Sequence, residues 1–257
     1  MRITTLIENT TECGMPVEHG LSLYIETERH TLLFDMGQTS LFAENAERLG
    51  IDLRKVDLAI LSHGHYDHGG GLRRFLEVND RAPVYLHRFA FEPHYNGTEK
   101  YIGLDVSLQS SDRLIFTEGV TKIDSGITLY DCNDRQQRWD FGSGGLNMEQ
   151  DGRFVPDDFR HEQVLLLEEK GKRVLISGCS HKGILNIAEW FRPDVLIGGF
   201  HFSKLPLDET LQSYAEEMSR YPTTYYTCHC TGVEQYRFMK RFVKDLQYLS
   251  TGKTIVL

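Results

Sequence analysis

The stretch Ser62-His63-Gly64-His65-Tyr66-Asp67-His68-Gly69-Gly70-Gly71 decides the fold, and it follows directly on the apolar segment Leu58–Ser62. It places three imidazoles and one carboxylate within six residues. In an extended turn, His63 and His65 project to the same side and can chelate one cation, because alternate residues share a face. Asp67 and His68 then lie on the opposite wall and suit a second cation. The stretch therefore predicts a site for two metal ions at the end of a buried strand.

The types of ligand atom limit which metals the site favours and which reactions it could catalyse. Imidazole and carboxylate ligands favour Zn²⁺, with Mn²⁺ or Fe as alternatives. Two divalent ions lower the pKa of a shared water and polarise a carbonyl or phosphoryl oxygen, which favours hydrolysis of an ester, lactone or phosphoester. Asp67 is the expected catalytic carboxylate, because it lies beside that water and can take its proton. Gly69–Gly71 either present backbone N–H groups to an anionic substrate group or only form a tight turn.

Apolar periodicity on both sides of this stretch predicts alternating strands and helices. Such a mixture favours a layered α/β sandwich, and we expect one domain over residues 1–257. The polar stretch Asn133–Phe159 is expected to be a lid or binding loop, with surface decoration as the alternative. Strands are predicted at Arg2–Glu8, Leu21–Glu26, His30–Asp35, Leu58–Ser62, Pro83–Leu86, Arg113–Phe116, Gly126–Cys132, Val164–Glu168, Arg173–Ser177, Asp194–Ile197 and Thr254–Leu257. Helices are predicted at Thr39–Leu49, after Gly71, and at Leu185–Phe191, Leu207–Tyr221 and Val233–Leu246, which makes the C-terminal third mostly helical.

Several side chains outside the histidine stretch are candidates for substrate contact. His201 follows a predicted strand, at the edge where open α/β sheets place binding groups, and is expected to contact substrate or support the site. The side chains that could hold a phosphate or carboxylate group are Lys182, Lys204 and Thr231. Four other histidines have no partner in the sequence and are interpreted as solvated or structurally satisfied: His19, His30, His87 and His94.

The net charge and the cysteine content limit which partners and which cellular compartment we expect for the protein. The formal net charge of −9 disfavours binding to a phosphate backbone, so nucleic acid is an unlikely partner and a small molecule is expected. There is no apolar run of membrane-spanning length and no export signal at the N-terminus. Five scattered cysteines are typical of a reducing compartment, and we predict a cytoplasmic protein. The oligomeric state is open, with a homodimer as one option.

The pattern His63-x-His65-x-Asp67-His68 after an apolar strand resembles the signature of the metallo-β-lactamase-fold superfamily. The resemblance implies an αββα sandwich with a dinuclear metal site. Leu32–Gly37 is similar to the early strand of that family, whose aspartate, here Asp35, lies beneath the metal turn and orients a ligand imidazole. His161 occupies the position of the third ligand motif, as a ligand or in support of one. His229 matches the final ligand histidine.

The fourth motif departs from the superfamily pattern, because Gly178-Cys179-Ser180-His181 stands where most members have Gly-Asp. Either Cys179 or His181 could replace the bridging aspartate, and a softer, more oxidisable thiolate site makes His181 the preferred ligand. Together with Gly198–Phe202 and His229–Gly232, this motif resembles the branch of 7,8-dihydropterin-6-methyl-4-(β-D-ribofuranosyl)-aminobenzene-5′-phosphate synthase-like proteins.

We therefore predict a metal-dependent hydrolase with a dinuclear site. A transferase or synthase in pterin-type cofactor metabolism is one alternative. A non-catalytic metal-binding sensor of ligands is the other.

Overall fold

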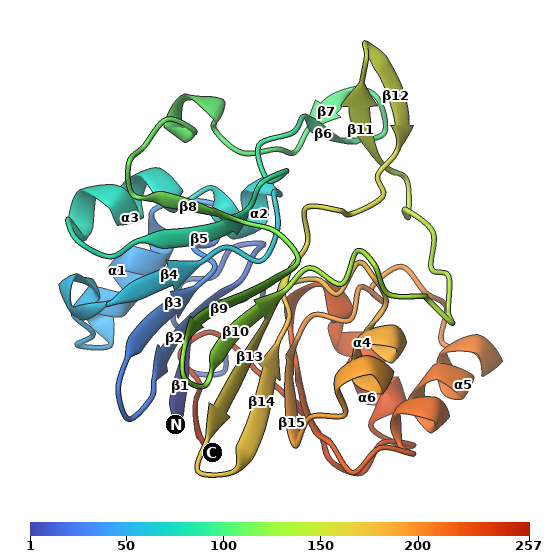
Figure 1. The fold of residues 1–257 in the computed structure, drawn as a ribbon. Helices are drawn as coiled ribbons and strands as arrows, with labels where there is room; N and C mark the ends of the chain where they lie inside the picture. The colour runs from blue at the N-terminus through green and yellow to red at the C-terminus, as the bar shows by residue number, and fades with distance from the viewer.

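Two seven-stranded sheets pack face to face in the computed structural model, which describes residues 1–257 (Figure 1). The first sheet consists, in spatial order, of β18 (Thr254–Val256), β1 (Arg2–Ile7), β2 (Ser22–Glu26), β3 (Thr31–Phe34), β4 (Leu58–Ile60), β5 (Val84–His87) and β8 (Leu114–Thr117). The second consists of β17 (Leu246–Tyr248), β16 (Thr224–Thr227), β15 (Val195–Gly198), β14 (Lys172–Ile176), β13 (Val164–Glu169), β10 (Ile127–Tyr130) and β9 (Val120–Asp124).

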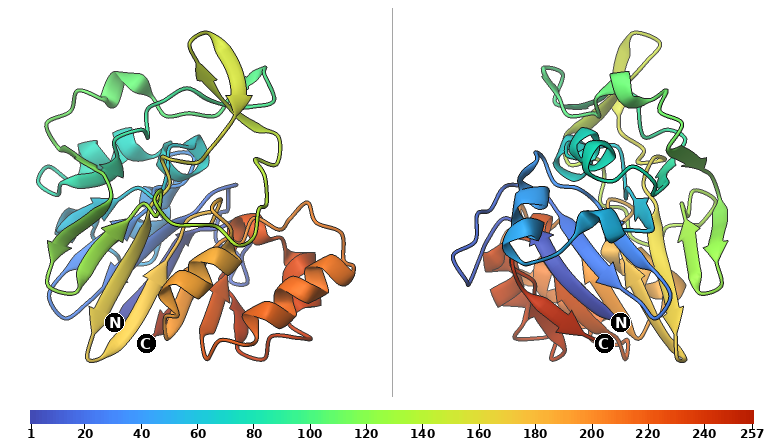
Figure 2. Two further views of the ribbon diagram at one scale, coloured as in Figure 1. Left: turned by 45° about the vertical axis from the view of Figure 1, so that its right-hand side comes forward. Right: turned by 90° about the vertical axis from the view of Figure 1, so that its left-hand side faces the viewer.

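A third, four-stranded sheet, which we call the small sheet, stands over one end of this sandwich (Figures 1 and 2). Its strands are β12 (Arg153–Pro156), β11 (Leu146–Gln150), β6 (His94–Asn96) and β7 (Lys100–Tyr101). The α-helices are α1 (Leu41–Arg48), α2 (Tyr66–Gly69), α3 (Leu72–Val78), α4 (Ile184–Phe191), α5 (Glu209–Met218) and α6 (Val233–Met239). Three short 3₁₀ turns complete the chain: η1 (Leu53–Lys55), η2 (Val106–Leu108) and η3 (His229–Thr231).

The protein has four layers, which are helices, sheet, sheet and helices. Side chains that alternate in direction along the inner strands explain this arrangement. In β3, Leu32 and Phe34 point into the core between the sheets, whereas Leu33 packs under the helices α1 and α3. In β14, Ile176 points into the core between the sheets and Leu175 packs against α4, α5 and α6. Both faces of these strands are buried, so their sequences are continuously apolar. The predicted αββα sandwich is confirmed, while the assignment of residues 1–257 to one domain stays a prediction.

Two expectations about local structure were wrong. The C-terminal third is not mostly helical, because β16 and β17 lie there in parallel beside β15. The helix predicted to end at Leu246 ends at Met239, and Leu246 pairs with Tyr225 in the sheet instead. Asn133–Phe159 contains the antiparallel hairpin of β11 and β12, which the sequence did not predict, and its role as a lid or binding loop stays a prediction. Leu146 and Met148 alternate with polar residues in β11, but an alternation of only five residues is a weak signal for a strand.

The ends of several strands meet beneath the small sheet. The histidine stretch follows β4, Gly178–His181 follows β14, His201 follows β15 and His229 follows β16. Because β14, β15 and β16 run parallel, their carboxyl ends share one edge, and residues far apart in sequence gather there. No helix of the structure is long and apolar enough to cross a bilayer.

Candidate metal centre

Three imidazoles, which we call the first donor group, converge from distant parts of the chain: His63, His65 and His181. Their ring centroids lie 4.6 Å (His63 to His65), 5.0 Å (His63 to His181) and 5.1 Å (His65 to His181) apart. Nε2 of His63 and both ring nitrogens of His181 are buried without a hydrogen-bond partner. Buried polar atoms are nearly always satisfied, so these nitrogens indicate a ligand that the rings share. A divalent metal ion fits, because neutral imidazole is among its preferred ligands.

Neighbouring side chains hold these rings in place. Oγ of Ser62 lies 2.8 Å from Nδ1 of His63 and leaves the other nitrogen free. The ring of Phe159 stacks on His181 with centroids 4.3 Å apart and planes 7° from parallel. Burial, with smaller effects from neighbouring imidazoles, lowers the pKa of His63 and His181 well below the usual value. Both rings are therefore neutral at pH 7, with lone pairs available to a cation.

The second donor group consists of Asp67, His68 and His229. The Nε2 atoms of His68 and His229 are 3.2 Å apart. Oδ2 of Asp67 lies 3.3 Å from Nε2 of His229 and 3.9 Å from Nε2 of His68. Two imidazole nitrogens and a carboxylate oxygen thus face one point, which suits a second cation.

Each imidazole of the second donor group is fixed through its other nitrogen. Nδ1 of His68 lies 2.6 Å from Oδ2 of Asp35, and Nδ1 of His229 lies 2.9 Å from Oδ1 of Asn9. Asp35 also accepts hydrogen bonds from the backbone N–H and hydroxyl of Ser62, both at 2.7 Å. An oxygen acceptor at Nδ1 leaves Nε2 for the metal, as in many metal-binding histidines. The sequence had assigned this contact to Asp35 but had not found Asn9.

Electrostatics distinguish the members of this group. Burial alone would lower the pKa of His68, but the carboxylates of Asp35 and Asp67 raise it to about 9. Burial would raise the pKa of Asp67, but His68, His19 and His229 hold it well below its usual value. Burial lowers the pKa of His229 to about 4, although Asp67 opposes the shift. Asp67 is therefore ionised throughout the physiological pH range.

Both ends of the chain fix the backbone at His229. The buried carboxylate of Glu8 accepts hydrogen bonds from the backbone N–H of His229 and from the hydroxyl of Tyr248, both at 2.7 Å. The backbone N–H of Glu8 donates to Oγ1 of Thr251 at 2.8 Å. Glu8, which directly follows β1, therefore meets Tyr248 at the end of β17 and Thr251 in the turn before β18, beneath the second donor group.

Cys179 lies between the two donor groups. Its Sγ is 3.2 Å from Nε2 of His68 and also lies within reach of His63, His181 and His229. Burial raises the pKa of the Cys179 thiol well above its usual value. The structure thus brings both sequence candidates for the missing aspartate to the centre, with His181 in the first donor group and Cys179 at the junction.

A cleft of about 400 Å³, which we call the cleft throughout, opens over both donor groups. His201 lines it, with its ring centroid 4.5 Å from that of His181. Burial, with smaller effects from His65 and Lys204, lowers the pKa of His201 to about 4, so this ring is neutral at pH 7. Apart from Asp67, the charged side chains on the cleft wall are Lys100 and Lys204. The cleft therefore combines a nitrogen-rich floor with a cationic rim.

For Lys182 and Thr231, which could contact substrate or support the site, the geometry favours support. The side chain of Lys182 is buried, and its ammonium group donates to the backbone carbonyls of Phe159 and Glu162. Oγ1 of Thr231 is also buried and accepts a hydrogen bond from the N–H of Phe200 at 2.8 Å. Neither residue lines the cleft. Both stabilise the turns that carry the donor groups, a role that the sequence does not distinguish from substrate contact.

Of the two roles that the sequence left open for Gly69–Gly71, the structure favours the tight turn. The N–H of Gly70 donates to Tyr66 and that of Gly71 to Gly37. A Cβ at Gly70 would lie 2.2 Å from the carbonyl oxygen of Gln38, and one at Gly71 would lie 2.2 Å from that of Met36. These glycines are needed because α2 and α3 pack directly on the backbone after β3.

His161 supports the site from outside the donor groups. Its Nδ1 accepts a hydrogen bond from the N–H of Gly64 at 2.9 Å, and its Nε2 lies 3.3 Å from Asp157. Of the two roles that the sequence left open, the geometry favours support over ligation.

Besides Glu8 and Asn9, three further polar residues near the centre were not assigned to it from the sequence: His19, His94 and Asp157. His19, which is more than half exposed, places Nε2 3.2 Å from Oδ2 of Asp67. His94 is not solvated, as it is fully buried with Nδ1 2.9 Å from Oδ2 of Asp157. No local motif marks these residues, because only the folded chain brings them near the donor groups.

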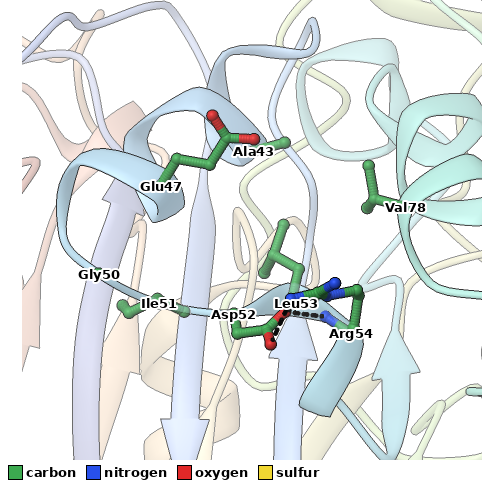
Figure 3. Close-up of a pocket in the computed structure, with 8 residues that line it drawn as sticks. All are labelled: Ala43, Glu47, Gly50, Ile51, Asp52, Leu53, Arg54 and Val78. Carbon is green, nitrogen blue, oxygen red and sulfur yellow. Dashed lines mark hydrogen bonds and ion pairs between the residues drawn. The ribbon is translucent and has the colours of Figure 1, made fainter.

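A second hollow of about 480 Å³ lies between α1, η1 and α3 (Figure 3). It contains no histidine or cysteine, and its one arginine, Arg54, is bonded to the neighbouring carboxylate of Asp52. Its other carboxylate, Glu47, is a single acidic side chain, so the hollow (Figure 3) lacks the converging imidazoles of the smaller cleft over the histidines.

The fold and the converging donor groups together define a metal-binding protein of αββα architecture. A family model of the metallo-β-lactamase superfamily matches residues 15–217, and the chain belongs to this superfamily. This fold implies that divalent metal is bound, and the histidine and aspartate groups described above can hold it.

Similar proteins extend over the whole chain. The 7,8-dihydropterin-6-methyl-4-(β-D-ribofuranosyl)-aminobenzene-5′-phosphate synthase of Methanocaldococcus jannaschii is 29% identical over 287 residues, which cover 99% of this chain and 96% of that protein. The uncharacterised protein MJ0448 of the same organism is 30% identical, with 98% of this chain and 99% of that protein covered. The crystal structure of Tm1679, a metal-dependent hydrolase of the β-lactamase superfamily, has a TM-score of 0.86 and 31% identity, with 100% of this chain and 99% of that chain covered.

Proposed function

We propose that the chain is a metal-dependent hydrolase that holds two divalent ions, Zn²⁺ first and Mn²⁺ or Fe as alternatives, and cleaves an ester, lactone or phosphoester. One observation carries the proposal. The unpartnered nitrogens of the first donor group lie beside the facing Nε2 atoms of His68 and His229. Two adjacent sets of free nitrogens suit two adjacent cations. Imidazole, carboxylate and a thiol form a donor set that Zn²⁺ accepts.

The metal ions, when bound, supply a water of lowered pKa and polarise the oxygen of the scissile group. The ionised carboxylate of Asp67 can accept a proton released at the second donor group. His201 is neutral and faces the cleft, so its N–H can donate to an oxygen that gains charge during the reaction. Asp67 and His201 are thus the proposed catalytic residues.

The rim of the cleft favours an anionic small molecule. Nζ of Lys100 donates to the hydroxyl of Tyr66 at 3.2 Å, and Nζ of Lys204 lies 3.5 Å from the carbonyl oxygen of Gly144. Neither ammonium group pairs with a carboxylate, although the chain as a whole carries a formal charge of −9. A phosphoester or a carboxylate-bearing ester would complement both lysines.

Metal content and hydrolysis test the proposal together. Metal-loaded protein should contain two ions per chain and hydrolyse at least one of bis(p-nitrophenyl) phosphate, a γ-lactone and p-nitrophenyl acetate. His65→Ala should lose metal and activity. His30→Ala is the matched control, because His30 pairs with Asp124 at 2.7 Å and lies in neither donor group. Metal-replete protein that hydrolyses no member of the panel would overturn the hydrolase.

A synthase that acts on a pterin is the second candidate, because a synthase of that kind is 29% identical over 99% of this chain. An aromatic hollow beside the cleft, lined by Phe141, Phe200 and Phe202, offers a place for a planar ring. Fluorescence titration with a 7,8-dihydropterin distinguishes the two candidates. Saturable binding and turnover of the pterin, without hydrolysis of the panel, would favour the synthase. Saturable binding without turnover of either the pterin or the panel would favour a metal-dependent sensor.

The remaining expectations form part of the proposal. The partner is a small molecule rather than nucleic acid, and all five cysteines are unpaired, which fits the cytoplasm. A homodimer remains one option for the assembly.

A further inference from the structure

A buried polar cluster lies next to the first donor group and belongs to neither donor group. At its centre, Oδ2 of Asp157 is 2.9 Å from Nδ1 of His94, 3.3 Å from Nε2 of His161 and 3.7 Å from Nε2 of His65. The Asp157 side chain is fully buried, and its Oδ1 accepts the backbone N–H of Phe159 at 2.8 Å. One carboxylate thus faces three imidazoles, of which only His65 also lines the cleft.

The hydrogen bonds of His161 show that this cluster differs from a metal site. Nδ1 of His161 accepts a hydrogen bond from Gly64, so the proton of the neutral ring is on Nε2, where it points to Asp157. A ring nitrogen that carries a proton has no lone pair for a metal. His161 therefore belongs to a hydrogen-bond network around Asp157 rather than to a third set of ligands.

The same carboxylate acts on His65. Nε2 of His65 is buried and has no hydrogen bond, and Asp157 is its nearest negative charge. At 3.7 Å the contact is longer than a hydrogen bond, so it acts through charge. A carboxylate on this side favours the tautomer with the proton on Nε2. The lone pair is then on Nδ1, which is not hydrogen bonded and is not among the buried unpartnered atoms.

We propose that Asp157 is a positioning residue that fixes the tautomer of His65 and thereby couples the first donor group to the small sheet. The proposal rests on the proposed role of His65 as a metal ligand. Asp157 directly follows β12, and its backbone N–H donates to the carbonyl oxygen of Leu146 in β11 at 3.0 Å. His94, the other partner of Asp157, begins β6. The small sheet is thus attached at its base to a candidate metal ligand.

The first test uses the wild-type, metal-free protein with ¹⁵N-labelled histidine. Long-range ¹H–¹⁵N NMR spectra distinguish the tautomers of each ring, and the spectrum of His65→Gln assigns the His65 signals. We expect His65 and His161 to carry their protons on Nε2. A proton on Nδ1 of His65 would overturn the proposal, and this result does not depend on whether any Asp157 variant folds.

The second test compares Asp157→Asn with Asp131→Asn. Asp131 is a matched control, because its buried carboxylate lies 3.2 Å from Nε2 of His87 and contacts neither donor group. Asp157→Asn should show a mixture of His65 tautomers and about 10–100-fold weaker Zn²⁺ binding in a chelator competition, which is the usual effect of removing such a partner. Asp131→Asn should leave both unchanged. Equal Zn²⁺ affinity in Asp157→Asn and wild type would contradict the proposal.

Hydrogen exchange tests the coupling to the small sheet. Zn²⁺ should slow amide exchange in residues 94–101 and 146–156 of the wild type and of Asp131→Asn. In Asp157→Asn saturated with Zn²⁺, this protection should be absent. Because Nε2 of His94 is also buried without a partner, metal content is measured on the same samples. A third ion per chain that Asp157→Asn loses would make the cluster a metal site and overturn the positioning role.

Discussion

The two donor groups lie side by side but differ in charge and in protonation. The first donor group, His63, His65 and His181, contains no carboxylate, and burial keeps its rings neutral. The second donor group contains Asp67, and the carboxylate of Asp35 keeps His68 protonated up to about pH 9 in the absence of metal. A cation at the second group must therefore displace a proton, whereas one at the first group need not. The comparison teaches that two neighbouring donor groups on one cleft floor can differ in whether a cation must displace a proton.

The largest expected effect comes from the residues that replace the missing aspartate. His181→Ala should remove the first cation and lower kcat/KM by more than about 100-fold, since even losing a partner outside the ligands costs 10–100-fold. Cys179→Ser should have a smaller effect, because its protonated thiol lies at the junction rather than in one group. Metal analysis and kinetics on both variants check the order. The reverse order would make Cys179 the ligand.

Asp35→Asn should act mainly on the second group. It removes the carboxylate that contacts Nδ1 of His68 at 2.6 Å, whereas it reaches His63 of the first group only through the hydroxyl of Ser62. Titration with Zn²⁺ in the presence of a chelating dye should show one step weakened about 10–100-fold and the other step weakened less. Equal weakening of both steps would mean that the groups do not act separately.

The stability of the metal-free protein should fall on both sides of about pH 6.5, the usual pKa of histidine. His68, with its pKa raised to about 9, contributes stability that is fully present below pH 6.5 and is lost as the pH rises through 9. The lowered pKa values of His63, His181 and His229 act oppositely, because the unfolded chain binds their protons first as the pH falls below 6.5. Each group changes the free energy of unfolding by up to about 1.4 kcal/mol per pH unit.

Urea unfolding in EDTA at several pH values between 5 and 9 measures the free energy of unfolding and shows whether it falls both below and above pH 6.5. His68→Gln should remove the loss of stability between pH 6.5 and about 8 and keep the loss below pH 6.5. A loss above about pH 8 should remain, because burial raises the pKa values of the Cys132, Cys179 and Cys228 thiols and the unfolded chain releases their protons first. A wild-type stability that does not decline between pH 6.5 and 9 would contradict the raised pKa of His68.

The smallest effect is expected at the rim, which serves both groups equally. Lys204→Met should raise KM for an anionic substrate about five-fold, since an exposed charge contact contributes up to about 1 kcal/mol. The value of kcat should change little. Lys122→Met, at an exposed position on β9, is the matched control. A neutral ester should show no difference between the three proteins.

The sequence predicted a residue of the candidate metal centre only where that residue lies within a recognisable local motif. The histidine stretch is contiguous, so His63, His65, Asp67 and His68 could be read directly, and the resemblance added His181 and His229. The partners Asn9, Glu8 and Asp157 could not be found, because each is an ordinary polar residue until the fold brings it to an imidazole. The same limit explains Lys182, whose exposure was assumed from its charge but whose ammonium group is buried among carbonyls.

The fold was predicted best where burial produces a strong pattern. β3, β13 and β14 are apolar on both faces and were found within one or two residues. β16 was missed although tyrosine and threonine favour strands, because the four residues Thr224–Thr227 form neither an apolar run nor an alternation, and only their place between β15 and β17 makes them a central strand. The small sheet was missed because its strands pair mainly with each other and bury little.

The meeting of both chain ends beneath His229 has a consequence for biosynthesis. Every member of the first donor group precedes residue 182, but His229 is held by Glu8 only together with Tyr248, and Glu8 in turn bonds to Thr251. All three members of the first donor group therefore leave the ribosome before the partners that hold His229 in place have been made. The backbone at His229 can gain its full set of hydrogen bonds only after β17 and its following turn have emerged.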